Sequence, residues 1–520
     1  MKDQITEKAL LLLKSNIISP ADPDNKLNWS ERKGPSGKKI ENLLVPPEAG
    51  DFITPNKNTF VGQWYWDTMG TNVGLLRSND DQLKKVALSM VRNLFMLYEK
   101  TGLIPNAADS VQNTRSQPPF LSSMCLDIAE HYFNPAETSE LTNWYLSAYD
   151  YCKRELEFPW EAHKTDQGFC WFDDIGDPGS IYSEEETLSF FRPESRSDFR
   201  ILRSIVHKKL FIDLEEELKR GFKETEAIIL KALGQLKKDQ RKELCKWLYS
   251  RRLLVCSGMD FTASYGLKEL PSSLTEILEP SMLSASDKVY STIEEVSPLD
   301  LNCLILKYYR DLRFIAGEIL KFEQPFNKAY LKAEIQKWED KIASQRDLIY
   351  NTHFSEKHSC FFNFNRETNE KMINNSHLTQ YAYPLFAHLT DSKGATELVK
   401  RIRSLITEYG LKSTVKKTGF QWDFNMWPLQ TWICFQGLKN YGFHEEAKKI
   451  ANGYMRCAKK VYQSENSFFE KYNAESGTVN TDGRYRSEPE FSWGAAVYVA
   501  LRQEGERGDR PWTMEGGGKR

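Results

Sequence analysis

Two acidic residues, Asp260 and Glu470, each stand among small and aromatic residues, in the segments SGMDF (257–261) and FEKYN (469–473). A glycosidic bond is hydrolysed by two carboxyl groups. One is protonated and releases the leaving oxygen, and the other is ionised and acts on the opposite face of the sugar. A carboxyl group flanked by Met259 and Phe261 is poorly solvated, which favours its protonated form. The pair therefore indicates an acid and a base of a glycosidase.

Both segments also have ordinary structural interpretations. An Asp close after a Gly is a frequent turn residue, and a Glu followed by Lys is a frequent ion pair on a helix surface. The segment RPES (192–195) is similarly ambiguous. Arg192 and Glu194 can hold sugar hydroxyls, because a guanidinium offers several donors and a carboxylate accepts from paired hydroxyls, but they can equally form a structural ion pair. The order of further motifs along the chain distinguishes these interpretations.

Six separated segments resemble those of the trehalases and occur in the order of that family: YWD (65–67), RSQPP (115–119), RPES (192–195), SGMDF (257–261), QWDF (421–424) and EKYN (470–473). The segments DLN (300–302) and YPLF (383–386) are also similar to family segments. Trehalases are inverting hydrolases of α,α-trehalose with an (α/α)6 barrel. No single segment is specific, but the ordered set is, and the resemblance covers roughly residues 50 to 500.

The resemblance implies that Asp260 is the general acid and that Glu470 is the base that activates water. It implies that the sugar is contacted by Trp66, Asp67, Asn106, Arg115, Gln117, Arg192, Glu194, Gly258 and Trp422. Gln421 and Asp423 would support these contacts from behind. The fold class that it implies is all-α, an (α/α)6 barrel of helical hairpins with the active-site loops at one end.

Some positions depart from the family pattern. Thr59 stands where the family has an Arg, and Gly62 where it has an acidic residue. A glycine-rich lid after the base is replaced by NTDGRYR (480–486), so that Glu488, Glu490 and Trp493 would have to substitute for it. The segment between Asp423 and Gln430 is also two residues shorter than the family pattern. These departures leave the acid and the base in place but leave the identity of the leaving sugar open.

The periodicity of apolar residues predicts helices wherever it is clear. Apolar residues at spacings of three and four define one buried stripe over residues 80–100. Further helices are expected over 205–252 with a break at Gly234, and over 301–322, 327–350, 398–409, 429–441, 445–462 and 493–502. No run is long enough to build a central sheet. We expect an N-terminal helix and irregular arm (1–55), a single barrel domain (56–503) and a disordered tail (504–520).

Composition argues against several classes of partner. The net charge is −2, with 70 basic and 72 acidic residues, which favours neither nucleic acid nor an anionic membrane. The nine cysteines include no Cys-x-x-Cys pair and the eight histidines are scattered, so no metal is expected. No phosphate-binding loop indicates a nucleotide cofactor, and no other cofactor is expected. The longest apolar run near the N-terminus, residues 9–13, is too short for a signal peptide or a membrane span, which predicts a cytoplasmic protein.

The sequence thus predicts an inverting glycoside hydrolase that converts α,α-trehalose into two glucose molecules. One alternative keeps the chemistry and changes the substrate to another small α-glucoside. A second alternative is a sugar-binding barrel that no longer cleaves, because Asp260 or Glu470 is mispositioned. The oligomeric state stays open.

Overall fold

The computed structural model describes residues 4–20, 41–44, 49–109, 113–173, 183–189, 191, 196–219, 222–260, 262–322, 328–374, 377–423, 425–479 and 486–506. Helices make up most of its regular structure, and the strands in these ranges are two or three residues long. The predicted all-α class is confirmed.

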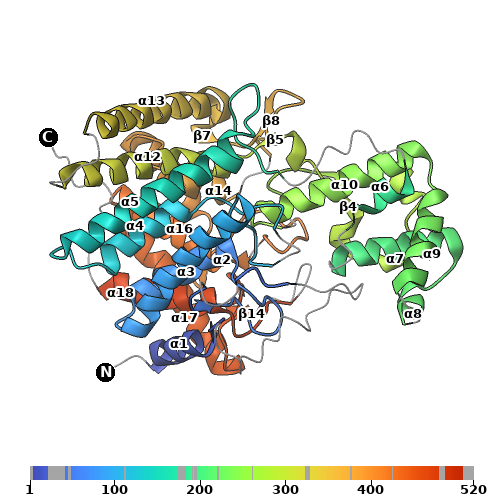
Figure 1. The fold of residues 1–520 in the computed structure, drawn as a ribbon, viewed down its shortest axis with the longest axis horizontal. Coiled ribbons are helices and arrows are strands. Elements are labelled where there is room, and N and C mark those ends of the chain that lie inside the picture. The colour runs from blue at the N-terminus through green and yellow to red at the C-terminus, as the bar shows by residue number, and fades with distance from the viewer. Residues whose placement is uncertain are drawn as a thin grey trace.

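Six inner helices form a closed ring in the described part of the chain: α2 (Tyr65–Arg77), α4 (Leu121–His131), α12 (Leu299–Lys321), α14 (Thr379–Phe386), α16 (Pro428–Asn440) and α18 (Ser492–Glu506). Each contacts the next, and α18 contacts α2 to close the ring. The outer helices are α3 (Asp81–Thr101), α5 (Thr138–Glu155), α13 (Lys328–His353), α15 (Ser392–Arg403), α17 (His444–Glu465) and α1 (Gln4–Ser15). The first five each pack on the inner helix that precedes them, and α1 packs on α18 (Figure 1). This is the predicted (α/α)6 barrel, with α1 as its twelfth helix.

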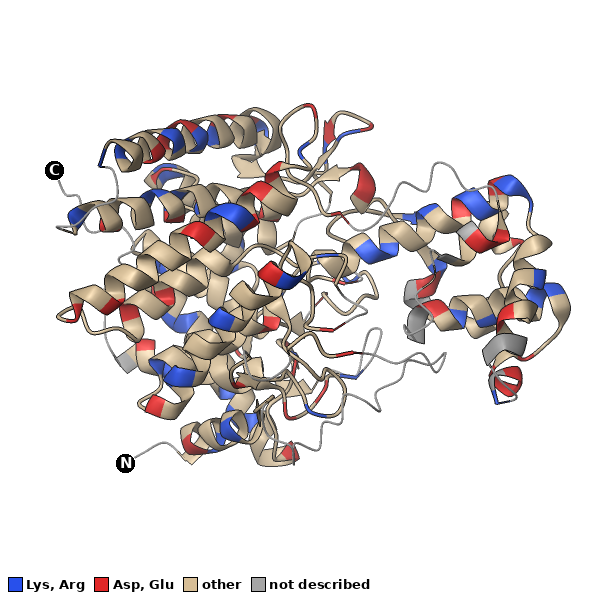
Figure 2. Cartoon of the chain, viewed as in Figure 1, with Lys and Arg blue, Asp and Glu red and all other residues tan. Residues whose placement is uncertain are grey.

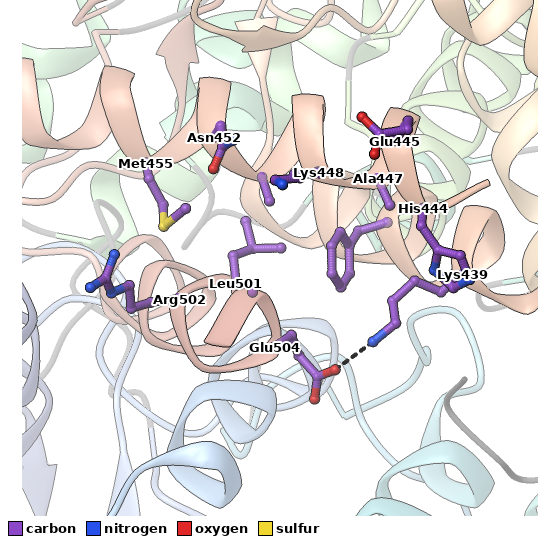
Figure 3. A pocket seen from close by; sticks show the side chains of 13 residues that line it. Lys439, His444, Glu445, Ala447, Lys448, Asn452, Met455, Leu501, Arg502 and Glu504 are labelled. Carbon is purple, nitrogen blue, oxygen red and sulfur yellow. Dashed lines mark hydrogen bonds and ion pairs between the residues drawn. The ribbon is translucent and has the colours of Figure 1, made fainter. Parts of the chain in front are cut away.

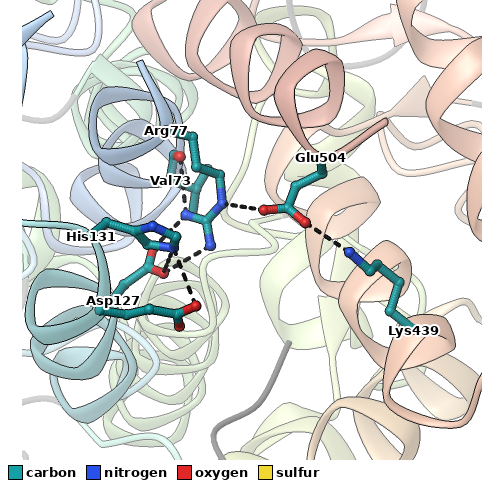
Figure 4. Close-up of polar contacts among 7 residues, drawn as sticks. Val73, Arg77, Asp127, His131, Lys439 and Glu504 are labelled. Carbon is teal, nitrogen blue, oxygen red and sulfur yellow. Dashed lines mark hydrogen bonds and ion pairs between the residues drawn. The ribbon is translucent and has the colours of Figure 1, made fainter. Parts of the chain in front are cut away.

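The ring closes where α2 and α18 pack at backbone distance. A Cβ atom on Gly74 would lie 2.1 Å from the carbonyl oxygen of Ala496, so only glycine fits at this crossing. One turn further along α2, the Arg77 guanidinium donates to both carboxylate oxygens of Asp127 at 2.8 and 2.9 Å, and to Glu504 at 3.1 Å. Lys439 completes the network by donating to Glu504 at 2.7 Å (Figure 4). These buried charges tie α2, α4, α16 and α18 together at their C-terminal ends.

A separate lobe is inserted between α5 and α12. It contains α6 (Glu184–Ser189), α7 (Arg196–Leu210), α8 (Leu214–Leu218), α9 (Phe222–Gly234), α10 (Lys238–Cys256) and α11 (Ser272–Thr275). Its apolar side chains form a cluster apart from that of the barrel, and Figure 1 shows α6 to α9 extending away from the barrel. Helix α10 belongs to both: Trp247 and Leu248 pack in the lobe, whereas Leu253 and Leu254 pack in the barrel. The sequence did not predict a second core within residues 56–503.

The strands form small antiparallel pairs beside the helices. They are β1 (Ile17–Ile18) with β2 (Phe52–Ile53), β3 (Leu267–Glu269) with β4 (Val289–Ser291), β5 (Val296–Ser297) with β8 (Phe364–Asn365) and β9 (Glu370–Lys371), β6 (Phe354–Ser355) with β7 (Cys360–Phe361), β10 (Ile406–Thr407) with β11 (Gly410–Leu411), and β12 (Asn425–Met426) with β13 (Tyr472–Asn473) and β14 (Thr478–Val479). The last sheet joins the segments that carry Gln421 and Glu470, because Met426 pairs with Tyr472.

Most predicted helices are present with shifted ends, and one is displaced by about half its length. The helix expected over residues 398–409 is α15, at 392–403. It begins there because the Asp391 side chain caps it by accepting from the Gly394 N–H at 2.8 Å. The expected second half instead forms the hairpin of β10 and β11. The predicted break at Gly234 is the C-terminus of α9.

The charged side chains and the cysteines have different surroundings. Lysine, arginine and acidic residues alternate along the outer helix α13 and over the lobe (Figure 2). All nine cysteines are buried and none forms a disulfide. Among the described helices, none has both the length and the apolar composition needed to cross a membrane.

Candidate active site

The predicted site residues gather at the N-terminal ends of the inner helices. Trp66 and Asp67 lie in the first turn of α2, and Trp493 lies in the first turn of α18. Asp260 follows α10 from the lobe, and Glu470 precedes β13. The N-terminal ends of the barrel helices thus bring together segments from both halves of the sequence.

Three carboxyl groups share this site. Burial above all, together with the nearby carboxylates of Glu470 and Asp260, raises the pKa of Asp67 to about 8. Both carboxylates must therefore lie close enough to Asp67 to affect its ionisation. The structure places the predicted acid and the predicted base in one cluster, with Asp67 as a third member that is mostly protonated at neutral pH.

A chain of hydrogen bonds connects the acid segment to the base. Gln421 donates its amide to the carbonyl oxygen of Asp260 at 2.9 Å and accepts from the Lys471 ammonium at 3.4 Å. Lys471 also donates to Glu470 Oε2 at 2.9 Å. Trp422 adds a second bond to the Asp260 carbonyl, from its indole nitrogen at 3.2 Å. Gln421 therefore bonds to the backbone of the acid segment and to the side chain of Lys471, and so fixes the two segments relative to one another.

The ion pair between Glu470 and Lys471 is present, but it is not the surface pair of the ordinary interpretation. The side chain of Lys471 is 0% exposed and that of Glu470 is 5% exposed. The ammonium lies 5.0 Å from the centre of the Trp427 ring, which adds a cation–π contact. Burial of two charges is costly unless they are paired and hydrogen-bonded. A buried, paired carboxylate of this kind is therefore unlike the solvated ion pairs of helix surfaces.

The backbone around Glu470 is fixed on both sides. Its N–H donates to the carbonyl oxygen of Glu488 at 2.9 Å, and its carbonyl oxygen accepts from the Trp493 indole at 2.9 Å. The Ser487 hydroxyl accepts from the Lys471 N–H at 3.0 Å and donates to the Lys471 carbonyl at 2.7 Å. Trp493 therefore holds the base segment itself. Residues 480–485, in the segment that replaces the glycine-rich lid of the family, lie outside the described residues.

Aromatic rings line the acid side of the cluster. Gly258 has φ +72, and a Cβ atom there would lie 2.9 Å from the Trp66 ring, so the turn before Asp260 sits on the face of this indole. Trp422 is stacked on Trp427 with ring centres 4.0 Å apart. Trp422 is 1% exposed and its indole nitrogen holds the acid segment, and its predicted contact with the sugar stays a prediction.

The loop that carries Asn106, Arg115 and Gln117 packs against the start of α2. The Asn106 carbonyl accepts from the Tyr65 N–H at 3.1 Å, and the Asn106 N–H donates to the Arg115 carbonyl at 2.8 Å. Gln117 accepts from the Trp66 N–H at 2.8 Å. The structure therefore brings these three residues together beside Trp66. Arg192, Glu194 and Phe261 lie outside the described residues.

One buried carboxyl group near the site was not predicted. Glu155, at the end of α5, accepts from the hydroxyls of Tyr65 and Tyr308, both at 2.5 Å. Burial raises its pKa to about 7, while these two hydrogen bonds lower it. Tyr65 immediately precedes Trp66, so Glu155 fixes the start of α2. No motif in the sequence marks Glu155; a buried polar position late in an outer helix is a contact that only the fold reveals.

Two other features lie at the opposite end of the barrel. Asp127, Glu130 and His131 bring possible metal ligands within 4.8 Å of one another, but Asp127 is already held by Arg77 through both oxygens. A pocket of about 430 Å³ lies between α17 and the C-terminal ends of α16 and α18, beside the pair formed by Lys439 and Glu504 (Figure 3). Neither feature contacts the carboxyl cluster of Asp67, Asp260 and Glu470.

Comparison with known proteins agrees with this geometry. A family model described as Trehalase matches residues 26–184 and 283–504. The matched residues contain most of the barrel and Glu470, whereas the unmatched residues 185–282 contain most of the lobe and Asp260.

Relatives and solved structures share the fold over most of the chain. The periplasmic trehalase of Salmonella agona (strain SL483) is 23% identical over 471 residues, which are 89% of this chain and 69% of that protein. The neutral trehalase Nth1 from Saccharomyces cerevisiae has a TM-score of 0.62 at 19% identity, over 87% of this chain and 73% of the other. The GH63 mannosylglycerate hydrolase from Thermus thermophilus has a TM-score of 0.53 at 15% identity, over 96% of this chain and all of the other.

One prediction is overturned by these relatives. The absence of a long apolar run near the N-terminus predicted a cytoplasmic protein, but the curated relatives are named periplasmic trehalases. The cytoplasmic assignment is therefore wrong. Hydropathy of one short segment is a weak guide to compartment.

Proposed function

The chain belongs to the trehalase family and is a glycoside hydrolase that cleaves trehalose to glucose, and we propose that Asp260 is its general acid and Glu470 its general base. The observation that carries this assignment is the shared cluster, in which both carboxylates act on the ionisation of Asp67. The buried bridge through Gln421 and Lys471 supports it, since it joins the two segments that must flank one sugar.

In the proposed reaction, water attacks the anomeric carbon of one glucose and transfers a proton to Glu470. The bond from that carbon to the bridging oxygen breaks, and Asp260 donates its proton to the departing oxygen. Glu470 ends protonated and Asp260 ionised, and solvent restores both. Attack from the opposite face inverts the configuration, which requires the two carboxyl groups to be about 6.5–9.5 Å apart.

Lys471 and Asp67 have different parts in this scheme. Lys471 pairs with the buried carboxylate of Glu470 through Oε2 and so holds that carboxylate in place. Asp67, with a pKa raised to about 8, retains a proton at neutral pH and can donate a hydrogen bond to a sugar hydroxyl. We assign Trp66, Asn106, Arg115 and Gln117 to the same sugar, because they pack together beside Asp67 at the start of α2.

The second, leaving glucose is assigned to the side of Thr59 and Glu488. Thr59 donates its hydroxyl to Glu488 Oε2 at 3.1 Å, and the Glu488 backbone holds the Glu470 N–H. A short hydroxyl and a carboxylate thus occupy the region where the family resemblance places an arginine. Because the contacts on the leaving-glucose side differ from the family pattern, another small α-glucoside stays an alternative substrate.

Substitution of the two carboxyl groups tests the proposal. Asp260→Asn removes the transferable proton and Glu470→Gln removes the group that activates water, so each should reduce turnover of trehalose by about 10²-fold or more. Both variants are nearly isosteric, and circular dichroism should show that they fold. Near-normal activity of either variant would remove that residue from the mechanism.

The anomers released give an independent test. Proton NMR of the first turnovers of the wild-type protein should show equal amounts of α- and β-glucose, because only the attacked ring inverts. Release of α-glucose alone would contradict the inverting mechanism. A panel of α-glucosides in the same assay distinguishes a strict trehalase from a broader α-glucosidase, and absence of any glucose would favour a binding barrel.

A further inference from the structure

The turn that carries the proposed acid is held from one side by its own first residue. Ser257, directly after α10, donates its hydroxyl to the Leu254 carbonyl at 2.6 Å and accepts from the Met259 N–H at 3.1 Å. Gly258 between them adopts a left-handed φ of +72. The position of Asp260 therefore depends on where the Ser257 hydroxyl is held.

A buried tyrosine lies at the far end of the segment that carries Asp260. Tyr265 is 0% exposed, so its phenol lies in the core. The same phenol donates to Oδ2 of Asp300 at 2.7 Å. Asp300 lies in the first turn of the inner helix α12, so the far end of the segment that carries Asp260 is bonded to the rigid barrel.

Asp300 is an expensive residue to bury for structural purposes alone. It is 4% exposed, and its other oxygen, Oδ1, makes no hydrogen bond to the described residues. Among those residues no lysine or arginine pairs with it, in contrast to Asp127, which is fully paired with Arg77. Burial raises the pKa of Asp300 to about 6, against the hydrogen bond from Tyr265, which lowers it. Buried carboxyl groups that are incompletely satisfied occur preferentially where function requires them.

The lobe makes such an anchor necessary. The acid segment follows α10, whose first half packs in the lobe core rather than in the barrel. Gln421 and Trp422 hold the Asp260 carbonyl, and a second fixed point after Asp260 would keep a displacement of the lobe from turning the acid relative to Glu470. A misplacement of about 1 Å can lower a rate by about 10²-fold.

We propose that Tyr265 and Asp300 are positioning residues for Asp260, because their hydrogen bond fixes the far end of the segment that carries the acid to the barrel. The inference rests on the proposed role of Asp260 as general acid. Neither residue touches the substrate, and neither transfers the proton. Their loss should impair the step in which the leaving oxygen is protonated and spare the step in which water attacks.

Leaving-group dependence distinguishes such a role from a merely structural one. Trehalose needs a proton on its leaving oxygen, whereas fluoride departs from α-glucosyl fluoride with little help from an acid. Tyr265→Phe and Asp300→Asn should each lower kcat for trehalose by about tenfold or more, with KM changed by less than about threefold. Hydrolysis of α-glucosyl fluoride should stay within about threefold of the wild type.

The full-length protein is used, with two reference variants. Asp260→Asn should show the same leaving-group dependence in a stronger form; if it does not, the assignment of the acid itself fails. Tyr149→Phe is the matched control, because Tyr149 is also a buried tyrosine that donates to a carboxylate, Glu334, at 2.8 Å, but between the outer helices. It should leave both substrates unaffected. The positioning role is overturned if Asp260→Asn shows the leaving-group dependence but Tyr265→Phe and Asp300→Asn do not. They would fail to show it by slowing the hydrolysis of both substrates equally, or by slowing neither. Thermal denaturation identifies any variant that fails to fold, and the other variant then decides.

Discussion

Replacing Asp67 by Asn should make the protein more stable at neutral pH. The pKa of Asp67 rises from 3.8 to about 8 in the folded chain, because burial and the charges of Glu470 and Asp260 disfavour its ionised form. Below pH 4 the group is protonated in both the folded and the unfolded chain and contributes no difference. As the pH rises from 4 to 8, only the unfolded chain releases the proton, so the folded state becomes progressively less stable. Asn carries no charge and removes this penalty.

The size of the effect follows from the same numbers. About three of the four pKa units of the shift affect the stability at pH 7. At about 1.4 kcal/mol per unit, they destabilise the folded state by at most about 4 kcal/mol. Asp67 is only partly buried by its exposed area, and solvent screens part of the interaction, so we expect about 2 kcal/mol. For 520 residues the entropy of unfolding is about 1.1 kcal/mol/K, which gives a rise in Tm of about 2 °C.

Differential scanning calorimetry between pH 4 and pH 8.5 measures the change in Tm that Asp67→Asn causes. The difference in Tm between Asp67→Asn and the wild type should be near zero at pH 4 and should grow with pH until it levels off above pH 8. Asp81→Asn, at an exposed position in the first turn of α3, is the control and should not show this growth. A difference that is constant over the whole range, or that shrinks as pH rises, would refute the charge cluster as its cause.

Three further predictions concern packing and selectivity. Gly74→Ala should destabilise the barrel by about 3 kcal/mol or more, because its Cβ would meet the Ala496 carbonyl at 2.1 Å, whereas Gly317→Ala, in an open part of α12, should stabilise it by about 0.5–1 kcal/mol in the same denaturation assay. Gly258→Ala should lower kcat for trehalose by about tenfold or more, since its φ of +72 and the Trp66 ring at 2.9 Å both oppose a side chain. Glu488→Gln should lower kcat/KM for trehalose more than for an aryl α-glucoside, and an equal loss on both would place Glu488 away from the leaving sugar.

The sequence predicts most of the helices, but it does not predict whether a helix packs in the barrel core or in the lobe core. The stripe of apolar residues over 80–100 predicts α3 because the periodicity of a helix with one buried face is a local property. The helices of the lobe show the same periodicity, yet their apolar faces pack against one another and not against the barrel. Periodicity shows that a face is buried and leaves open what buries it. The displaced helix α15 has a similar cause, since its start is set by the Asp391 cap.

Motifs in the sequence indicate the carboxyl groups of the candidate site, but they do not indicate the contacts that hold these groups. Ordered motifs pointed to Asp67, Asp260 and Glu470, and the structure brings these three together. The bridge from Gln421 to Lys471 spans fifty positions, and Tyr265 meets Asp300 across a segment that includes three strands. Such contacts depend on the fold and leave no spacing in the sequence. Glu155, which holds Tyr65 from the end of another helix, was missed for the same reason.

The separation of acid from base is the property on which inversion depends, and two different parts of the chain supply it. Glu470 is set by the barrel, through the Trp493 indole and the backbone of Glu488. The proposed acid instead follows a helix that half belongs to a lobe outside the matched family regions. Gln421 therefore does more than support the sugar contacts, the role that the sequence predicts. It bonds to the acid segment and to Lys471 and so connects the two segments directly. A barrel can accommodate an insertion beside its acid only if contacts of this kind keep the two carboxyl groups at a fixed distance.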